Sequence, residues 1–118
     1  MIRDSFSTFD VVKALGIPRE RLKDWMSKGF VRPSVPAKGK GTKAIFTRDD
    51  VYSVAIFKHL VEDFGMKRSA AAKHLAEYKA TGEDMFWVIV ASRLESCLYV
   101  DVPVIRAIVN RTLPVLSL

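Results

Sequence analysis

The segment STFDVVKALGIPRERLKDWMSKGF, residues 7–30, determines the interpretation of the first half of the chain. Ser7 can accept a hydrogen bond from the backbone N–H three residues on, and Asp10 stands where an acid reaches back to the cap. A helix is therefore expected to begin here, with Gly16 as its left-handed C-terminal residue. The apolar face of this helix is predicted to consist of Phe9, Val12 and Leu15.

A second short helix is predicted to follow directly. Pro18 suits its first turn because the N–H that proline lacks would be unpaired there, and Gly29 closes it after Lys28. At 100° per residue the apolar side holds Leu22, Trp25 and Met26. The opposite, mostly cationic side holds Glu20, Arg21, Lys23, Asp24, Ser27 and Lys28. Two short helices joined by a tight turn favour a helix-turn-helix, whose polar face enters the major groove of duplex DNA.

The next segment predicts a ribbon with a basic tip. FVRP (residues 30–33) and AIF (residues 44–46) are two short extended arms, and AKGKGTK (residues 37–43) lies between them. Glycine supplies the turn geometry and lysine cannot pack inside, so a hairpin or open wing is expected. The natural target of its lysines is phosphate.

Two further helices are predicted after the ribbon. Residues 47–50, TRDD, form a second capping box, and the helix that it starts extends to Gly65. Its apolar stripe is predicted to be Val51, Val54, Phe57, Val61 and Phe64. A fourth helix is expected from Ser69 to Lys79, with Gly82 as its stop. Its inward residues are predicted to be Ala72, Leu75 and Ala76.

These residues resemble the MerR-type transcriptional regulators over roughly the first two thirds of the chain. The resemblance rests on the segments STF (7–9), LGI (15–17), RLKDW (21–25), GFVRP (29–33), DDV (49–51) and FGM (64–66), and on Phe46. It implies a winged helix-turn-helix domain that binds duplex DNA, with Lys23 and Asp24 where the family carries an arginine and a tyrosine. No long heptad helix follows and the cysteine pair or triplet of the metal-sensing members is absent, so metal sensing is not implied.

The charge distribution supports a nucleic-acid partner. The 118 residues carry a formal net charge of +6, with a pI of about 9.7. Residues 1–48 hold eleven basic and four acidic side chains, a net +7, and the remainder carries −1. The excess falls on the predicted DNA-binding segment, although basic residues also form solvated faces. The residues predicted to contact DNA are Arg19, Arg21, Lys23, Lys28, Lys38, Lys40, Lys43 and Arg48.

Other functional sites find little support in the sequence. KGKGT at residues 38–42 lacks the upstream glycine of a phosphate-binding loop. Cys97 is the single cysteine, and His59 and His74 lack a third ligand at metal spacing, so no metal or cofactor is expected. No nucleophile has a recognisable base beside it, so an enzyme is not expected. Neither a signal peptide nor a long apolar run is present, and a cytoplasmic protein is predicted.

The residues after Gly82 allow two structures. Residues 86–91 and 97–102 are rich in β-branched and aromatic residues, which favours a two-stranded hairpin. Residues 84–98 also fit helical spacing, so one helix is the alternative. A final helix is expected from Pro103, which suits a first turn, to Pro114. The apolar face of that helix is predicted to be Ile105, Ile108, Val109 and Leu113.

We therefore predict a mainly α protein with a small β wing, divided into a winged helix-turn-helix at residues 1–82 and a C-terminal segment at residues 83–118. The C-terminal segment, α+β or helical, is predicted to form a homodimer through Phe86, Trp87, Tyr99, Ile105, Ile108 and Val109. The leading function is a sequence-specific, duplex-DNA-binding transcriptional regulator. An excisionase-like or architectural DNA binder, and a protein-interaction adaptor with a basic face, are the alternatives.

Overall fold

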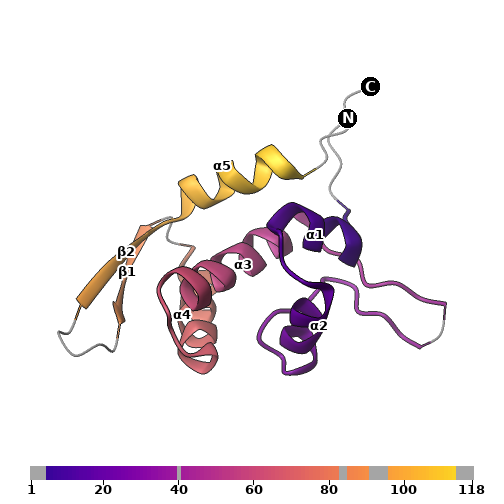
Figure 1. Ribbon diagram of the computed structural model, residues 1–118, viewed down its shortest axis with the longest axis horizontal. Coiled ribbons are helices and arrows are strands. Elements are labelled where there is room, and N and C mark those ends of the chain that lie inside the picture. Colours follow the sequence, from indigo (N-terminus) through magenta and orange to yellow (C-terminus); the bar gives the residue numbers. More distant parts are fainter. Residues whose placement is uncertain (1–4, 40, 83–84, 91–95, 114–118) are drawn as a thin grey trace.

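The computed structural model describes the backbone of residues 5–39, 41–82, 85–90 and 96–113, and the side chains of residues 5–39, 41–82 and 100–113. In chain order its elements are α1 (Thr8–Leu15), α2 (Arg19–Ser27), α3 (Arg48–Lys58), the π-helical turn η1 (His59–Asp63), α4 (Arg68–Thr81), β1 (Met85–Val90), β2 (Ser96–Asp101) and α5 (Val102–Thr112). Figure 1 shows a helical body with the wing at one end and the β1–β2 hairpin at the other. The predicted mainly α fold with a small β component is confirmed.

Both predicted capping boxes are present, and they start α1 and α3. Ser7 Oγ accepts a hydrogen bond from the Asp10 amide at 3.2 Å, and the Asp10 carboxylate accepts one from the Ser7 amide at 2.9 Å. Thr47 and Asp50 repeat this exchange at 3.2 and 2.9 Å. Each box satisfies two backbone donors that a helix N-terminus leaves unpaired. Gly16, with φ of 64°, ends α1 in the left-handed conformation that its position predicts.

Helix α3 is the centre of the core. Val51, Val54, Ile56 and Phe57 are fully buried, and Ser53 is buried with its hydroxyl bonded to the Asp49 carbonyl at 3.1 Å. The predicted stripe residues Val51, Val54 and Phe57 are buried, and Ser53 and Ile56 are buried as well. Helix α3 packs against both α4 and α5, and a helix enclosed in this way buries residues beyond a single stripe.

Aromatic rings attach α2 to this central helix. The Trp25 ring meets the Phe57 ring edge-on at 4.9 Å between centroids, and Phe30 stacks on the same ring at 5.5 Å. Leu22 and Trp25 are buried as predicted, and Met26 is half-buried. The cationic side of α2 consequently faces away from the core.

Three of the predicted inward positions are wrong. Phe9 is 68% exposed, because Val11, about 200° away around α1, is the residue that the core buries. On α4 the buried pair is Ala71 and Leu75, which lie one turn apart, so Ala76 is turned outward. On α5 Ile108 is 53% exposed. Ile105 and Val109 of α5, and Leu113 at its C-cap, are buried as predicted.

The ribbon is an open wing held by isolated bridges. Val35 and Ile45 exchange two backbone hydrogen bonds of 3.1 and 2.8 Å, so the first arm pairs at Val35 and not within residues 30–33 as predicted. The reason is that Val31 is buried in the core, which keeps the chain against the body before the wing begins. At the tip Thr42 Oγ1 accepts from the Lys38 amide at 2.6 Å and donates to the Gly39 carbonyl at 2.8 Å.

A second bridge closes the wing onto the N-terminus of the fold. Phe6 and Phe46 donate to each other's carbonyls at 2.8 Å in both directions, and both rings are buried. Because Ser7 and Thr47 directly follow this pair, α1 and α3 both begin at the bridge.

The C-terminal region forms the predicted hairpin, so the alternative helix over residues 84–98 is wrong. The strands are antiparallel, from Met85 opposite Asp101 to Val90 opposite Ser96. The Asp101 carboxylate then accepts from the Val104 amide at 3.3 Å and caps α5, with Pro103 in the first turn as predicted. Helix α5 runs back across α3 and α1 (Figure 1).

The path of α5 across α3 and α1 shows that part of the predicted dimer surface is wrong. Ile105 and Val109 are 8% and 1% exposed, and they belong to the core that α5 shares with α3 and α1. They are therefore not available to a second copy. The side chains of Phe86, Trp87 and Tyr99 lie outside the described residues. The core also continues past residue 82, and the domain boundary there stays a prediction.

Two identical substitutions on α5 test this packing. We expect Val109→Ala to lower the free energy of unfolding by about 2 kcal/mol, because it removes two buried methyl groups and leaves a cavity. Val104→Ala, at a 52% exposed position of the same helix, should change it by less than about 0.5 kcal/mol. Urea denaturation of both variants measures the difference, and equal losses would contradict the placement of α5.

Candidate nucleic-acid interface

A groove of about 460 Å³ lies between α1, α2 and the wing. Its floor and walls are mostly apolar, and its cations come from two elements, Arg19 and Lys23 from α2 and Lys43 from the wing. Hydroxyl groups of Ser7, Thr8 and Thr42 add hydrogen-bonding capacity. The remaining lining residues are Phe9, Val12, Met26, Ala37 and Ala44. Such a groove can receive an anionic ligand that also carries apolar surface.

Lys23 of α2 lies beside the wing. It lines this groove and also a neighbouring hollow of about 440 Å³ at the base of the wing, with Arg32, Pro33 and Pro36. Its side chain is exposed. A ligand lying across α2 and the wing would therefore meet Lys23 from either side.

Two other cations of α2 are held by acids. Arg21 Nη1 lies 3.3 Å from Glu62 Oε2 of η1, and Lys28 Nζ lies 3.2 Å from Asp24 Oδ1. All four side chains are partly or well exposed, so each pair adds at most about 1 kcal/mol to stability. Their larger effect is on the direction of the two basic side chains, because the pairs turn both cations toward the α4 side of α2.

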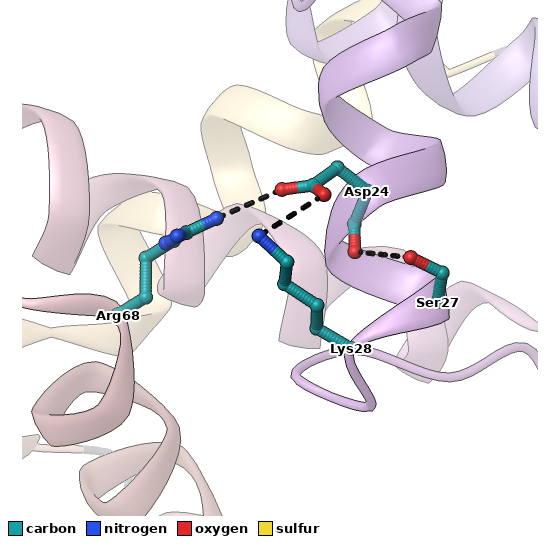
Figure 2. Close-up of polar contacts among 4 residues, drawn as sticks. All are labelled: Asp24, Ser27, Lys28 and Arg68. Carbon is teal, nitrogen blue, oxygen red and sulfur yellow. Dashed lines mark hydrogen bonds and ion pairs between the residues drawn. The ribbon is translucent and has the colours of Figure 1, made fainter.

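Asp24 is the centre of this second cluster. Its Oδ2 accepts from Arg68 Nη1 of α4 at 2.8 Å while Oδ1 faces Lys28, and Figure 2 shows both cations converging on the one carboxylate. Ser27 Oγ also donates to the Asp24 carbonyl at 3.0 Å. The Arg68 guanidinium lies 5.5 Å from the centroid of the Phe30 ring. The acid on the polar side of α2 thus anchors that helix to α4.

Arg48 also lies away from the groove. Its Nη1 donates to Asn110 Oδ1 of α5 at 2.6 Å, and its guanidinium lies 5.2 Å from the Phe6 ring centroid. Of the remaining predicted contacts, Lys38 is exposed on the wing and Lys40 lies outside the described residues. The structure therefore gathers Arg19, Lys23 and Lys43 around one groove and places Arg21, Lys28 and Arg48 elsewhere.

For most of these diversions the sequence contains no local signal. Arg68 is 44 residues from Asp24, and Asn110 is 62 residues from Arg48, so neither pairing follows from helical spacing. Only the Asp24–Lys28 pair, at i and i+4 on one helix, could have been anticipated.

Among the described residues no three His, Cys, Asp or Glu side chains gather to hold a metal ion. His59 instead pairs with Asp63 at 2.6 Å. No helix in the described part of the chain is long and apolar enough to cross a membrane.

Comparison with known proteins identifies the family. The family model for MerR HTH family regulatory proteins matches residues 6–78, from the Phe6 bridge through most of α4. The chain belongs to the MerR family. It is accordingly a winged helix-turn-helix protein of a DNA-binding regulatory family, as the resemblance predicted. A search of curated proteins finds no match. The hairpin and α5 lie beyond the residues that match the family.

Lys23 and Lys28 provide a matched pair for testing this interface. Lys23→Ala should change the ranking of duplex DNA sequences, by about 1–3 kcal/mol if the ammonium contacts a base edge. Lys28→Ala removes the same charge from the C-cap of the same helix, at a position paired with Asp24, and should have the smaller effect. Competition binding with a panel of duplexes measures both. If Lys23→Ala lowered the affinity equally for every DNA sequence, Lys23 would be a phosphate contact and not a base reader.

Proposed function

We propose that this MerR family member binds a specific duplex DNA sequence as a homodimer and regulates transcription from it in the cytoplasm. The observation that carries the proposal is the convergence of exposed cations from α2 and from the wing on one groove. In a helix-turn-helix the second helix enters the major groove, and a basic wing beside it meets the phosphate backbone. The formal net charge of +7 on residues 1–48 also supports binding to DNA.

Within this proposal the residues divide by role. Lys23 is the candidate base reader because it is exposed at the middle of α2 and faces the groove. Arg19 and Lys43 are candidate phosphate contacts because they line the groove with Lys23, and Lys38 is a third because it is exposed on the wing. Phosphate contacts position a protein on DNA, whereas base contacts specify the sequence.

A second copy is needed for tight binding of an operator. Helix α2 has nine residues, which can reach only a few base pairs. Two copies related by a two-fold axis would place two α2 helices in successive major grooves, about 34–36 Å apart or a multiple of that. A footprint with two inverted half-sites supports this arrangement, whereas protected tandem repeats would favour an architectural, excisionase-like binder.

The surface that we propose for the dimer is the outer side of α5. Val104 and Ile108 are 52% and 53% exposed and lie one turn apart on that helix, about 100° around it from the buried pair Ile105 and Val109. The neighbouring hairpin projects from the body at the end opposite the wing (Figure 1). A two-stranded hairpin is marginally stable alone, and a partner at this end would support it while leaving α2 and the wing accessible.

The wing is tested through the salt dependence of DNA binding. The double variant Lys38→Ala with Lys43→Ala should weaken binding to any duplex and make the slope of log K against log salt shallower by about 1.8, since each lost phosphate contact removes about 0.9. The control is Lys73→Ala with Lys79→Ala, which removes the same charge from exposed positions of α4. An unchanged slope in the wing variant would remove the wing from the interface.

The dimer is tested by a charge on α5. Ile108→Glu should convert the protein to a monomer at micromolar concentration, because burying an unpaired carboxylate at an interface is unfavourable. Ala76→Glu adds the same charge to an exposed position of α4 and should leave the oligomeric state unchanged. Sedimentation equilibrium measures both, and a monomeric wild-type protein would contradict the homodimer.

A further inference from the structure

Phe9 is an exposed aromatic residue that the fold does not use. At 68% it has the largest exposed fraction among the exposed large hydrophobic residues of the described chain. The core contact of α1 is made by Val11, and the N-terminal bridge is made by Phe6, both of them buried. A single exposed apolar residue is common on protein surfaces, so exposure alone assigns no role to Phe9.

The position of Phe9 in the charged groove indicates a role in binding a ligand. Phe9 lines the groove together with Arg19 and Lys43, and Lys13 Nζ lies 6.0 Å from the centroid of its ring. Cations from α1, α2 and the wing therefore lie around an apolar ring. The matching ligand carries two anionic groups with apolar surface between them.

A DNA strand has this chemistry in its backbone. Each deoxyribose presents C–H groups between two phosphates, and the first helix of a helix-turn-helix crosses the backbone while the second enters the groove. A base edge is less accessible to Phe9, because Phe9 lies on α1 and Lys23 of α2 faces the groove beside it. The charges and the helix that carries the ring thus favour the sugar.

We infer that Phe9 packs against a deoxyribose of the bound DNA strand, with Lys13 on one flanking phosphate and Arg19 or Lys43 on the other. This inference rests on the proposed DNA-binding function and extends it, because it gives the interface an apolar contact that contributes affinity independently of counterion release. Removing the ring should lower the binding constant while leaving the salt dependence unchanged.

The experiment compares full-length variants in fluorescence anisotropy titrations over a salt series. Phe9→Ala should weaken binding about five- to tenfold on every duplex with an unchanged slope of log K against log salt, and Phe9→Leu should retain most of the affinity. Lys43→Ala should instead make the slope shallower by about 0.9. Val61→Ala is the control, because Val61 is a partly exposed apolar residue of η1 outside the groove lining and away from the wing, and it should bind as the wild type does.

Other outcomes separate the inference from the function on which it rests. Unchanged affinity in Phe9→Ala would overturn the sugar contact while leaving DNA binding intact. Failure of the wild-type protein to bind duplex DNA at low salt would overturn both. The wild-type protein could also bind duplexes with uracil in place of thymine as weakly as Phe9→Ala binds the thymine duplexes. That result would assign the ring to a thymine methyl group and overturn the sugar contact.

A crosslinking measurement covers the case in which Phe9→Ala fails to fold. With p-benzoylphenylalanine at position 9, irradiation should attach the protein to the DNA strand, whereas the same group at position 76, which is exposed on α4, should not. No crosslink from position 9 in a protein that binds the duplex would overturn the inference.

Discussion

The paired backbone hydrogen bonds between Phe6 and Phe46 are the constraint on which the interface depends. Both N–H groups and both carbonyls are satisfied at 2.8 Å, and both side chains are buried, so the bridge is shielded from competing water. The next residue on each strand, Ser7 or Thr47, caps a helix. One bridge therefore sets the start of α1, the start of α3 and the end of the wing, and the groove is bounded by two of these three segments.

The acids of the structure decide which cations remain directed at the groove. Glu62 and Asp24 hold Arg21 and Lys28 on the side of α2 that faces η1 and α4. Arg19 and Lys23 lie on the other side with the wing lysine Lys43. Since exposed charges are screened over about 10 Å at ordinary ionic strength, this separation concentrates the positive potential beside the wing instead of spreading it around α2.

The local features of the fold could be predicted from the sequence, and the long-range ones could not. Capping boxes, glycine C-caps and the hairpin follow from residue chemistry within a few positions, which is why the start of α1 and the choice of strands over residues 84–98 were predicted correctly. The burial of Phe9 and the availability of Val109 were predicted wrongly, because a helical period identifies a face without stating what covers it. For α5 the cover is α3, some fifty residues earlier in the chain.

The same limit applies to the DNA-binding site, and it explains why some of the predicted contact residues line the groove and others do not. The sequence predicted a cationic side of α2, yet the side chains on that side point in two directions. Arg21 is paired with Glu62 of η1 and Lys28 with Asp24, whereas Lys23 lines the groove beside the wing. A charge count cannot distinguish Lys23 from Lys28, whereas the Asp24 carboxylate at 3.2 Å from Lys28 does. The DNA-contact residues themselves stay predictions, now narrowed to those that line the groove or the wing.

The C-terminal helix is physically continuous with the interface although it lies outside the region that matches the family. Asn110 Oδ1 accepts from Arg48 at 2.6 Å and from Tyr52 at 3.0 Å, both on α3, and Arg106 donates to Tyr78 of α4 at 2.8 Å. Arg48 is the first residue of α3 and follows the wing by two positions. Helix α5 is therefore joined to the first residue of α3, two positions after the wing, by a hydrogen bond as well as by the core that it shares with α3 and α1.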